Sequence, residues 1–197
     1  VEKSYLSKST YSATGPLDNS KRTYPDIMAV GGSITTMLRD NEASMITVSG
    51  TSYAAPLVAG AAALVRQARP ALSASEVKAL LLNTTLFRSS VRNEYGLGFM
   101  KADAAVTAAL NGEVVSGTVA TNRRVANFEF KTTTASMKSI TITWMRKLPF
   151  APPPNLDLRI YDSSNRLIAE DLNPENSYEN VLFMASATTT YRAEITW

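Results

Sequence analysis

Residues 50–60 read GTSYAAPLVAG, and this stretch opens a helix. Most side chains from Ala54 to Ala63 are small, and they allow another element to approach closely, so we expect this helix to be buried at the centre of a domain. A proline is tolerated in the first turn of a helix, where backbone N–H groups are free. Pro56 therefore places the helix start close to Ser52, and Pro70 ends it after Arg69.

Ser52 has two interpretations. Serine is a favoured helix cap, because its oxygen accepts free backbone N–H groups. The same position also suits a nucleophile, since the helix dipole and an unpaired N–H can stabilise a developing oxyanion, and Gly50 leaves room for a carbonyl group. The G-x-S-x-G pattern of other hydrolases is not met, because Ala54 occupies the last position. A serine also needs a base, and the 197 residues include no histidine.

Composition limits the class of protein. Hydrophobic residues make up 45% and charged residues 19%, with a net charge of +3, which indicates a globular chain with a core. No basic cluster is dense enough to predict nucleic-acid binding, and no apolar run is long enough to predict a membrane span. The absence of cysteine excludes disulfides and thiolate metal sites. Asp157, Asp162 and Asp171 fit solvated strand edges and turns better than calcium ligands, so no metal site is predicted.

The first part of the chain alternates helical patterns with short apolar runs. Buried strands are expected at 27–30 and 45–48. Ser73 and Glu76 form a capping box ahead of a helix with Val77, Leu80 and Leu81 on one face. A glycine-punctuated turn spans 95–99, and a last helix spans 102–110. We place a domain boundary at Asn111-Gly112, which separates residues 1–111 from 112–197.

The second part alternates apolar and polar residues with a period of two. This pattern covers 126–130, 140–144, 156–160 and 191–197, separated by turn residues. Such spacing predicts an antiparallel β-sandwich. The expected core consists of Phe128, Phe130, Ile142, Trp144, Leu158 and Ile160.

The helix motif resembles a known family. Gly50, Thr51, Ser52, Ala54, Pro56, Val58, Ala59 and Gly60 match the serine motif of the subtilisin-like serine peptidases. Upstream, YSATGPLDNSKRTYPDIMAVGG is similar to further segments of that family, and downstream YGLGFMKADAAV resembles its glycine turn and closing helix. The resemblance implies an α/β fold for 1–111, the C-terminal part of a parallel-sheet catalytic domain.

The resemblance also implies an activity. Ser52 would be the nucleophile of a serine endopeptidase, with Gly50, Thr51 and Tyr53 beside the substrate. The triad order is Asp, His, Ser, so the Asp, the His and the oxyanion Asn would lie on an N-terminal partner, the other part of the same gene product, separated by internal cleavage. Asp26 belongs to a structural block. Tyr53 stands where the family commonly has Met, and Val30 where it often has Pro.

Residues 112–197 resemble, more loosely, the jelly-roll-like β-sandwich modules appended to many such peptidases, through LDLRIYDSSNRLI and YENVLFMASATTTYRAEITW. The family resemblance implies no catalytic cofactor and a secreted protein; a structural calcium ion is compatible with it, but the sequence does not specify ligands. Two other functions stay open. One is a scaffolding protein that keeps the fold without the base, and the other is a binding module that acts through the β-sandwich.

Overall fold

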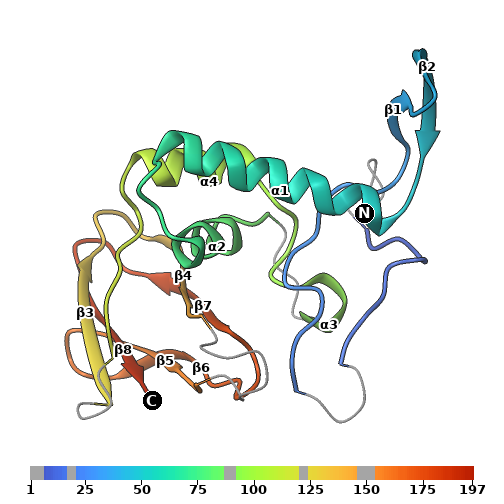
Figure 1. The fold of residues 1–197 in the computed structure, drawn as a ribbon. Coiled ribbons are helices and arrows are strands. Elements are labelled where there is room, and N and C mark those ends of the chain that lie inside the picture. The colour runs from blue at the N-terminus through green and yellow to red at the C-terminus, as the bar shows by residue number, and fades with distance from the viewer. Residues whose placement is uncertain (1–6, 17–20, 87–91, 120–123, 146–153) are drawn as a thin grey trace.

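The computed structural model describes residues 7–16, 21–86, 92–119, 124–145 and 154–197. Helices dominate the first part of the chain and antiparallel strands the second (Figure 1). The helices are α1 (Thr51–Ala68), α2 (Ala74–Asn83), α3 (Arg92–Tyr95) and α4 (Ala102–Leu110). The strands are β1 (Ile34–Leu38), β2 (Asn41–Val48), β3 (Val125–Lys131), β4 (Ser136–Thr143), β5 (Asp157–Tyr161), β6 (Leu167–Asp171), β7 (Tyr178–Ala185) and β8 (Thr190–Thr196).

Helices α1, α2 and α4 share one hydrophobic core. The predicted apolar face of α2 is confirmed, because Val77, Leu80 and Leu81 are buried in it. Helix α4 contributes alanines, of which Ala105 and Ala109 are fully buried, so its backbone approaches α1 closely. As predicted, α4 ends at Leu110, with Gly112 in a left-handed conformation at φ 72°.

The predicted capping box at the start of α2 is confirmed. The Ser73 backbone N–H donates to Glu76 Oε2 at 2.7 Å, and the Glu76 N–H donates to Ser73 Oγ at 3.3 Å. Ser116 Oγ, beyond α4, donates to Glu76 Oε1 at 2.7 Å. The Ser73 side chain, Ser116 and the Ser73 N–H, in that order, lower the pKa of Glu76 to about 2.

This lowered pKa predicts an acid-sensitive cap. The folded pKa lies below the ordinary value, so the stabilisation is complete above about pH 4.5 and is lost as pH falls toward 2. We expect Glu76→Gln, which keeps the hydrogen-bonding shape, to reduce thermal stability at pH 7 and to match the wild type at pH 2. The exposed Glu129→Gln is the control. A Glu76→Gln deficit that persists unchanged at pH 2 would contradict the prediction.

Strands β1 and β2 form an antiparallel hairpin that projects from the body at the N-terminal end of α1 (Figure 1). The expectation of a strand at 45–48 is met by β2, but its expected burial is wrong. Met45 is 65% exposed and Ile46 40% exposed, because none of the described elements covers the hairpin. Met37, opposite Met45 in the register, is equally exposed.

The segment 27–30 is buried but is not a regular strand. Met28 and Ala29 are buried, and Met28 forms an isolated parallel bridge with Phe99. The pairings between the named strands are all antiparallel. The glycine turn that pairs with this segment needs Gly96, at φ 58°. A Cβ there would lie 2.4 Å from the carbonyl oxygen of Pro25.

The second part contains a four-stranded sheet in the order β3-β8-β5-β6 and a two-stranded sheet β4-β7, both antiparallel. Side chains from both sheets meet in one core. Its fully buried members include Leu158 and Ile160 on β5, and Phe183 on β7 packs edge-on against Tyr191 on β8, with ring centroids 5.2 Å apart. The strands expected at 126–130, 140–144, 156–160 and 191–197 correspond to β3, β4, β5 and β8.

The expected core is right in part. Leu158 and Ile160 are buried in it, and Phe128, Phe130 and Ile142 pack against it. Trp144 is an incorrect assignment. It follows the end of β4, is only half-buried, and lies outside this cluster. Its backbone N–H donates to the Ser177 carbonyl at the end of the ladder.

Candidate active site

The chain before α1 is fixed by two glycines. The Gly50 N–H donates to the Gly31 carbonyl at 2.7 Å, and the Tyr11 hydroxyl donates to the same oxygen at 3.0 Å. A Cβ on Gly31 would lie 2.8 Å from the Gly50 oxygen, so no larger residue fits without a shift. Gly50 itself has φ 157° and ψ 156°, a region populated essentially by glycine. Sequence reasoning included Gly31 in the matched segments but missed its contact with Gly50.

Ser52 is the second residue of α1, as the position of Pro56 predicts. Gly50, not Ser52, is the N-cap residue, and it makes no side-chain cap hydrogen bond. The interpretation of Ser52 as a helix cap is therefore wrong. Its side chain is exposed, and no hydrogen bond joins its hydroxyl or its backbone N–H to any of the residues that the structure describes.

The other predicted site residues surround Ser52. Thr51 is exposed as the first residue of α1. The Tyr53 ring lies against Gly50, since a Cβ on Gly50 would be 3.4 Å from Tyr53 Cδ2, and the Tyr53 N–H donates to the Gly50 carbonyl at 3.1 Å. Tyr53 is 37% exposed, so its side chain is partly open to solvent beside Ser52.

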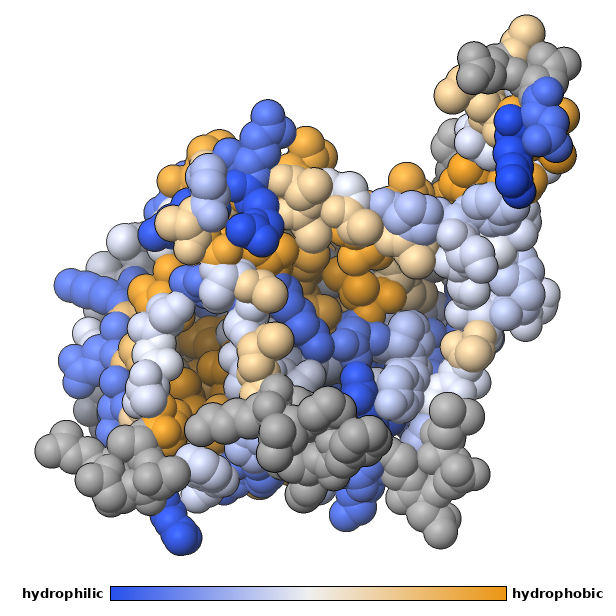
Figure 2. Space-filling view, in the orientation of Figure 1, coloured by the Kyte–Doolittle hydropathy of each residue, from blue (hydrophilic) through white to orange (hydrophobic). Residues whose placement is uncertain are grey.

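The N-terminal half of α1 is exposed, which corrects the expectation of a buried helix. Only Ala61 and Val65 of this helix are buried, while Leu57 is 43% and Leu64 51% exposed. A Cβ on Gly60 would meet nothing within 4 Å. Figure 2 shows this apolar surface over α1 and on the hairpin. Ala55, Ala59, Gly60 and Ala63 thus belong to a surface that none of the described elements covers, whereas Ala61 is buried in the core that α1 shares with α2 and α4.

The acidic residues weighed as cation ligands all have protein partners. Asp157 and Asp162 pair with Arg159 and Arg166, and Asp171 pairs with Arg92 at 2.6 Å. Among the described residues, no three acidic, histidine or cysteine side chains are grouped to hold a metal ion. None of the helices in the described part of the chain is long and apolar enough to cross a membrane.

What this arrangement can do chemically is limited by its missing base. An exposed hydroxyl at a helix N-terminus, with a free N–H beside it, is suited to attack a carbonyl carbon and to hold the resulting oxyanion. The chain has no histidine, so the group that removes the hydroxyl proton is not supplied by an imidazole of this sequence.

The region around Ser52 is similar in sequence to known proteins. The subtilase family model matches residues 3–98. Over 94 residues the chain is 42% identical to an extracellular protease from Xanthomonas campestris. This match covers 44% of this chain and 16% of that protein. Over 110 residues it is 36% identical to serine protease AprX from Bacillus subtilis, and this match covers 49% of this chain and 25% of AprX.

A third relative is subtilisin BL from Lederbergia lenta, which is 39% identical over 80 residues, 41% of this chain and 29% of that protein. The chain thus spans less than a third of the length of each of these three relatives. The matched region includes the glycine pair, the start of α1 and the turn at Gly96. Residues 3–98 of this chain are therefore similar in sequence to the subtilase family.

Proposed function

We propose that Ser52 is the nucleophile of a subtilisin-like serine endopeptidase. The observation that supports this most is the exposed, unpaired Ser52 hydroxyl at the start of an 18-residue helix, within a motif of the matched family. Ser52 Oγ attacks the carbonyl carbon of the scissile peptide, its proton passes through a base to the leaving amine, and water then hydrolyses the acyl-enzyme. The Ser52 N–H donates to the oxyanion, and Gly50, Thr51 and Tyr53 line the substrate.

The base comes from outside these 197 residues in this proposal. An N-terminal part of the same protease supplies the Asp, the His and the oxyanion Asn. The uncovered face of α1 supports such a partner, because Leu57, Gly60 and Leu64 present an apolar surface that a sheet can cover. Residues 1–111 are then the C-terminal part of a parallel-sheet catalytic domain.

We also propose that residues 112–197 form a jelly-roll-like module. The common core of the two antiparallel sheets supports this assignment. The printed name of one relative, an extracellular protease, supports secretion of this protein too.

A fluorophosphonate probe tests the proposal, since it reacts with an activated serine. We expect the whole protein that contains this chain to be labelled, and peptide mapping to locate the label at Ser52. The 197-residue chain alone should stay unlabelled, because it lacks the base. Labelling of the isolated chain would overturn the need for a partner. No labelling of the whole protein would favour a scaffolding role.

Tyr53 leads to a prediction about oxidation. A methionine beside a nucleophile is converted by peroxide to its sulfoxide, which adds a polar group at the site, whereas tyrosine lacks that sulfur. We expect the whole enzyme to keep most of its activity after a peroxide treatment that oxidises exposed methionines such as Met37 and Met45. A Tyr53→Met variant should lose activity under the same treatment. Equal rates of inactivation for the two proteins would show the idea to be wrong.

A further inference from the structure

The start of β7 connects the strand-rich part of the chain to the subtilase part. Tyr178 and Glu179 are at most 1% exposed, and Tyr178 packs in a cluster with Leu82 and Leu97. Lys78 on α2 lies over the Tyr178 ring, 5.3 Å from its centroid, and is paired with Asp26 at 2.9 Å. The first residues of β7 are thus buried where the strand-rich part of the chain meets α2.

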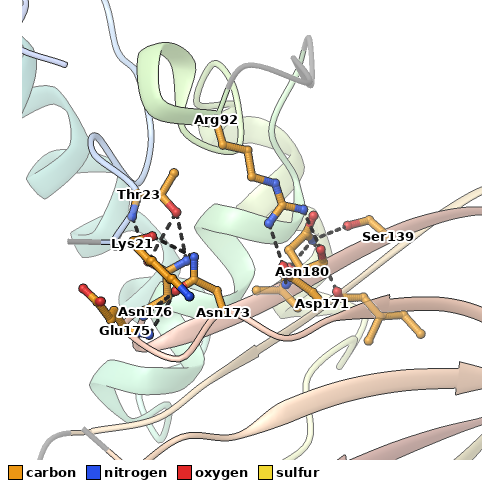
Figure 3. A network of polar contacts seen from close by, with 11 residues as sticks. Lys21, Thr23, Arg92, Ser139, Asp171, Asn173, Glu175, Asn176 and Asn180 are labelled. Atoms are coloured by element: carbon orange, nitrogen blue, oxygen red, sulfur yellow. Dashed lines mark hydrogen bonds and ion pairs between the residues drawn. The ribbon is translucent and has the colours of Figure 1, made fainter. Parts of the chain in front are cut away.

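Arg92 on α3 joins this junction to β6 and β7 (Figure 3). Its Nη1 donates to Asp171 Oδ2 at 2.6 Å, and its Nη2 donates to the Asn180 carbonyl at 2.8 Å. The Asn180 backbone N–H donates to the same Asp171 oxygen at 3.0 Å. The Asp171 side chain is only 15% exposed, so this charged arrangement is largely shielded from water.

Glu179 directly precedes Asn180 on β7. None of the described donors satisfies its carboxyl group fully. Neither carboxyl oxygen of Glu179 has a hydrogen-bond partner among the described residues, although the side chain is completely buried. Its cross-strand neighbour on β4 is Ile142, which offers no charge. The Asp171 carboxyl and the Asn173 backbone N–H face it, and Arg92 supplies the nearby positive charge.

Two carboxylates against one guanidinium leave an excess negative charge in a buried place, which is costly unless it is neutralised. A proton on Glu179 removes that charge and turns an acceptor into a donor. The protonated oxygen of Glu179 can then donate a hydrogen bond to the Asp171 carboxyl, which also accepts hydrogen bonds from Arg92 and the Asn180 N–H. This single proton gives one of the two Glu179 oxygens a hydrogen-bond partner.

We propose that Glu179 is a neutral carboxylic acid that donates its proton to Asp171, and that this shared proton keeps β7 attached to α3. Loss of the proton leaves two facing carboxylates and weakens the attachment through Asp171 and Asn180. The junction is therefore a pH-sensitive latch, closed in acid and neutral solution and strained in alkali. The other ionisable groups near it are Tyr178 on β7, Lys78 on α2 and Asp26 in the segment before β1.

Burial, and then the neighbouring Asp171, raise the pKa of Glu179 to about 10. The raised folded pKa means that the folded protein holds a proton that the unfolded chain releases above about pH 4.5. Stability contributed by this group is complete below that pH and falls as pH rises toward 10. Because unfolding releases this one proton, the unfolding equilibrium constant rises by up to about tenfold for each unit by which the pH is raised.

The test uses the whole protein that contains this chain. Equilibrium unfolding is measured from pH 5 to pH 9 for the wild type, for Glu179→Gln, and for the exposed Glu129→Gln as control. Glutamine has a similar shape, carries no charge and can donate to Asp171. We expect Glu179→Gln to lose most of the pH-dependent destabilisation and to be more stable than the wild type at pH 9, while Glu129→Gln follows the wild type. Parallel pH curves for all three proteins would overturn the proposal.

Infrared difference spectroscopy of the wild type is an independent measurement that needs no stable variant. Raising the pH from 8 to above 10 should remove the C=O stretching band of a protonated carboxyl group. A folded Glu179→Gln variant should lack that band already at pH 8. Absence of the band in the wild type at pH 8 would overturn the proposal. Stabilisation of the wild type by added calcium at pH 8, abolished in Glu179→Gln, would show that a cation and not a proton occupies the pair, and would also overturn it.

Discussion

Replacing Ser52 with alanine should reduce peptide-bond turnover of the whole enzyme by about 10⁴- to 10⁶-fold. The scale is the one known for subtilisin, and residues 3–98 match the subtilase family model. In the proposed mechanism the hydroxyl oxygen of Ser52 forms the acyl-enzyme, and a methyl group cannot replace it. The backbone N–H of residue 52 stays in place, so residual oxyanion binding keeps the rate above that of the uncatalysed reaction.

The measurement is kcat on a peptide substrate, with Ser164→Ala as the control. Ser164 lies in the turn between β5 and β6, far from α1 in the chain and exposed. It should leave kcat unchanged, and unfolding curves of both variants should match that of the wild type. A Ser52→Ala enzyme that keeps a tenth or more of the wild-type kcat would exclude Ser52 as the nucleophile.

The second large effect concerns the core between the two sheets. Phe183 on β7 is 5% exposed and lies edge-on to Phe130 and Tyr191, with ring centroids 6.5 and 5.2 Å away. Truncation to alanine removes these contacts and leaves a cavity, because the strands on both sides are fixed by their ladders. We expect Phe183→Ala to lower the free energy of unfolding by roughly 3–5 kcal/mol.

The neighbouring residue provides a matched control. Leu182 is 44% exposed on the opposite face of the same strand, so Leu182→Ala should cost less than about 1 kcal/mol. Denaturant unfolding of the whole protein measures both. Equal costs at the two positions would mean that the buried face of β7 is not the one described.

The helices could be predicted from the sequence because punctuation residues mark their ends. Pro70, the Ser73–Glu76 box and Asn111-Gly112 each act within one turn of the chain, and α1, α2 and α4 begin and end near the expected residues. Burial was less predictable. The small residues of α1 were expected to be covered, yet a sequence does not reveal which neighbours are present to cover them.

Strand β7 escaped prediction for a different reason. It is buried on both faces near its start, so apolar and polar residues do not alternate there, and Glu179 and Asn180 are buried although they are polar. The Asn180 side chain has its partners far away in sequence, since its Nδ2 donates to Ser139 Oγ at 3.0 Å and to Thr141 Oγ1 at 2.8 Å, and no local pattern encodes them. The short strand β6 was missed as well, since LIAED has little periodicity.

At the candidate site, the motif located Ser52 but not the contacts that hold it. The hydrogen bond between Gly50 and Gly31 joins residues 19 positions apart, and only the folded chain reveals it. The domain boundary at Asn111-Gly112 and the roles of Gly50, Thr51 and Tyr53 stay predictions. The catalytic base could not be located from any pattern in a sequence without histidine.

The bond between Gly31 and Gly50 closes the β1–β2 hairpin at its base, so the hairpin is a loop with both ends tied. Residues can be added at its tip, around Arg39 and Asp40, without changing the distance from Gly31 to Ser52. The reason is that the hydrogen bond between Gly31 and Gly50 holds the two ends of the hairpin together whatever the length between them. We therefore expect the chain length at the tip to vary among related sequences, while Gly31 and Gly50 keep Ser52 in place. Insertions accepted at the tip and rejected at either glycine are the expected pattern of variation.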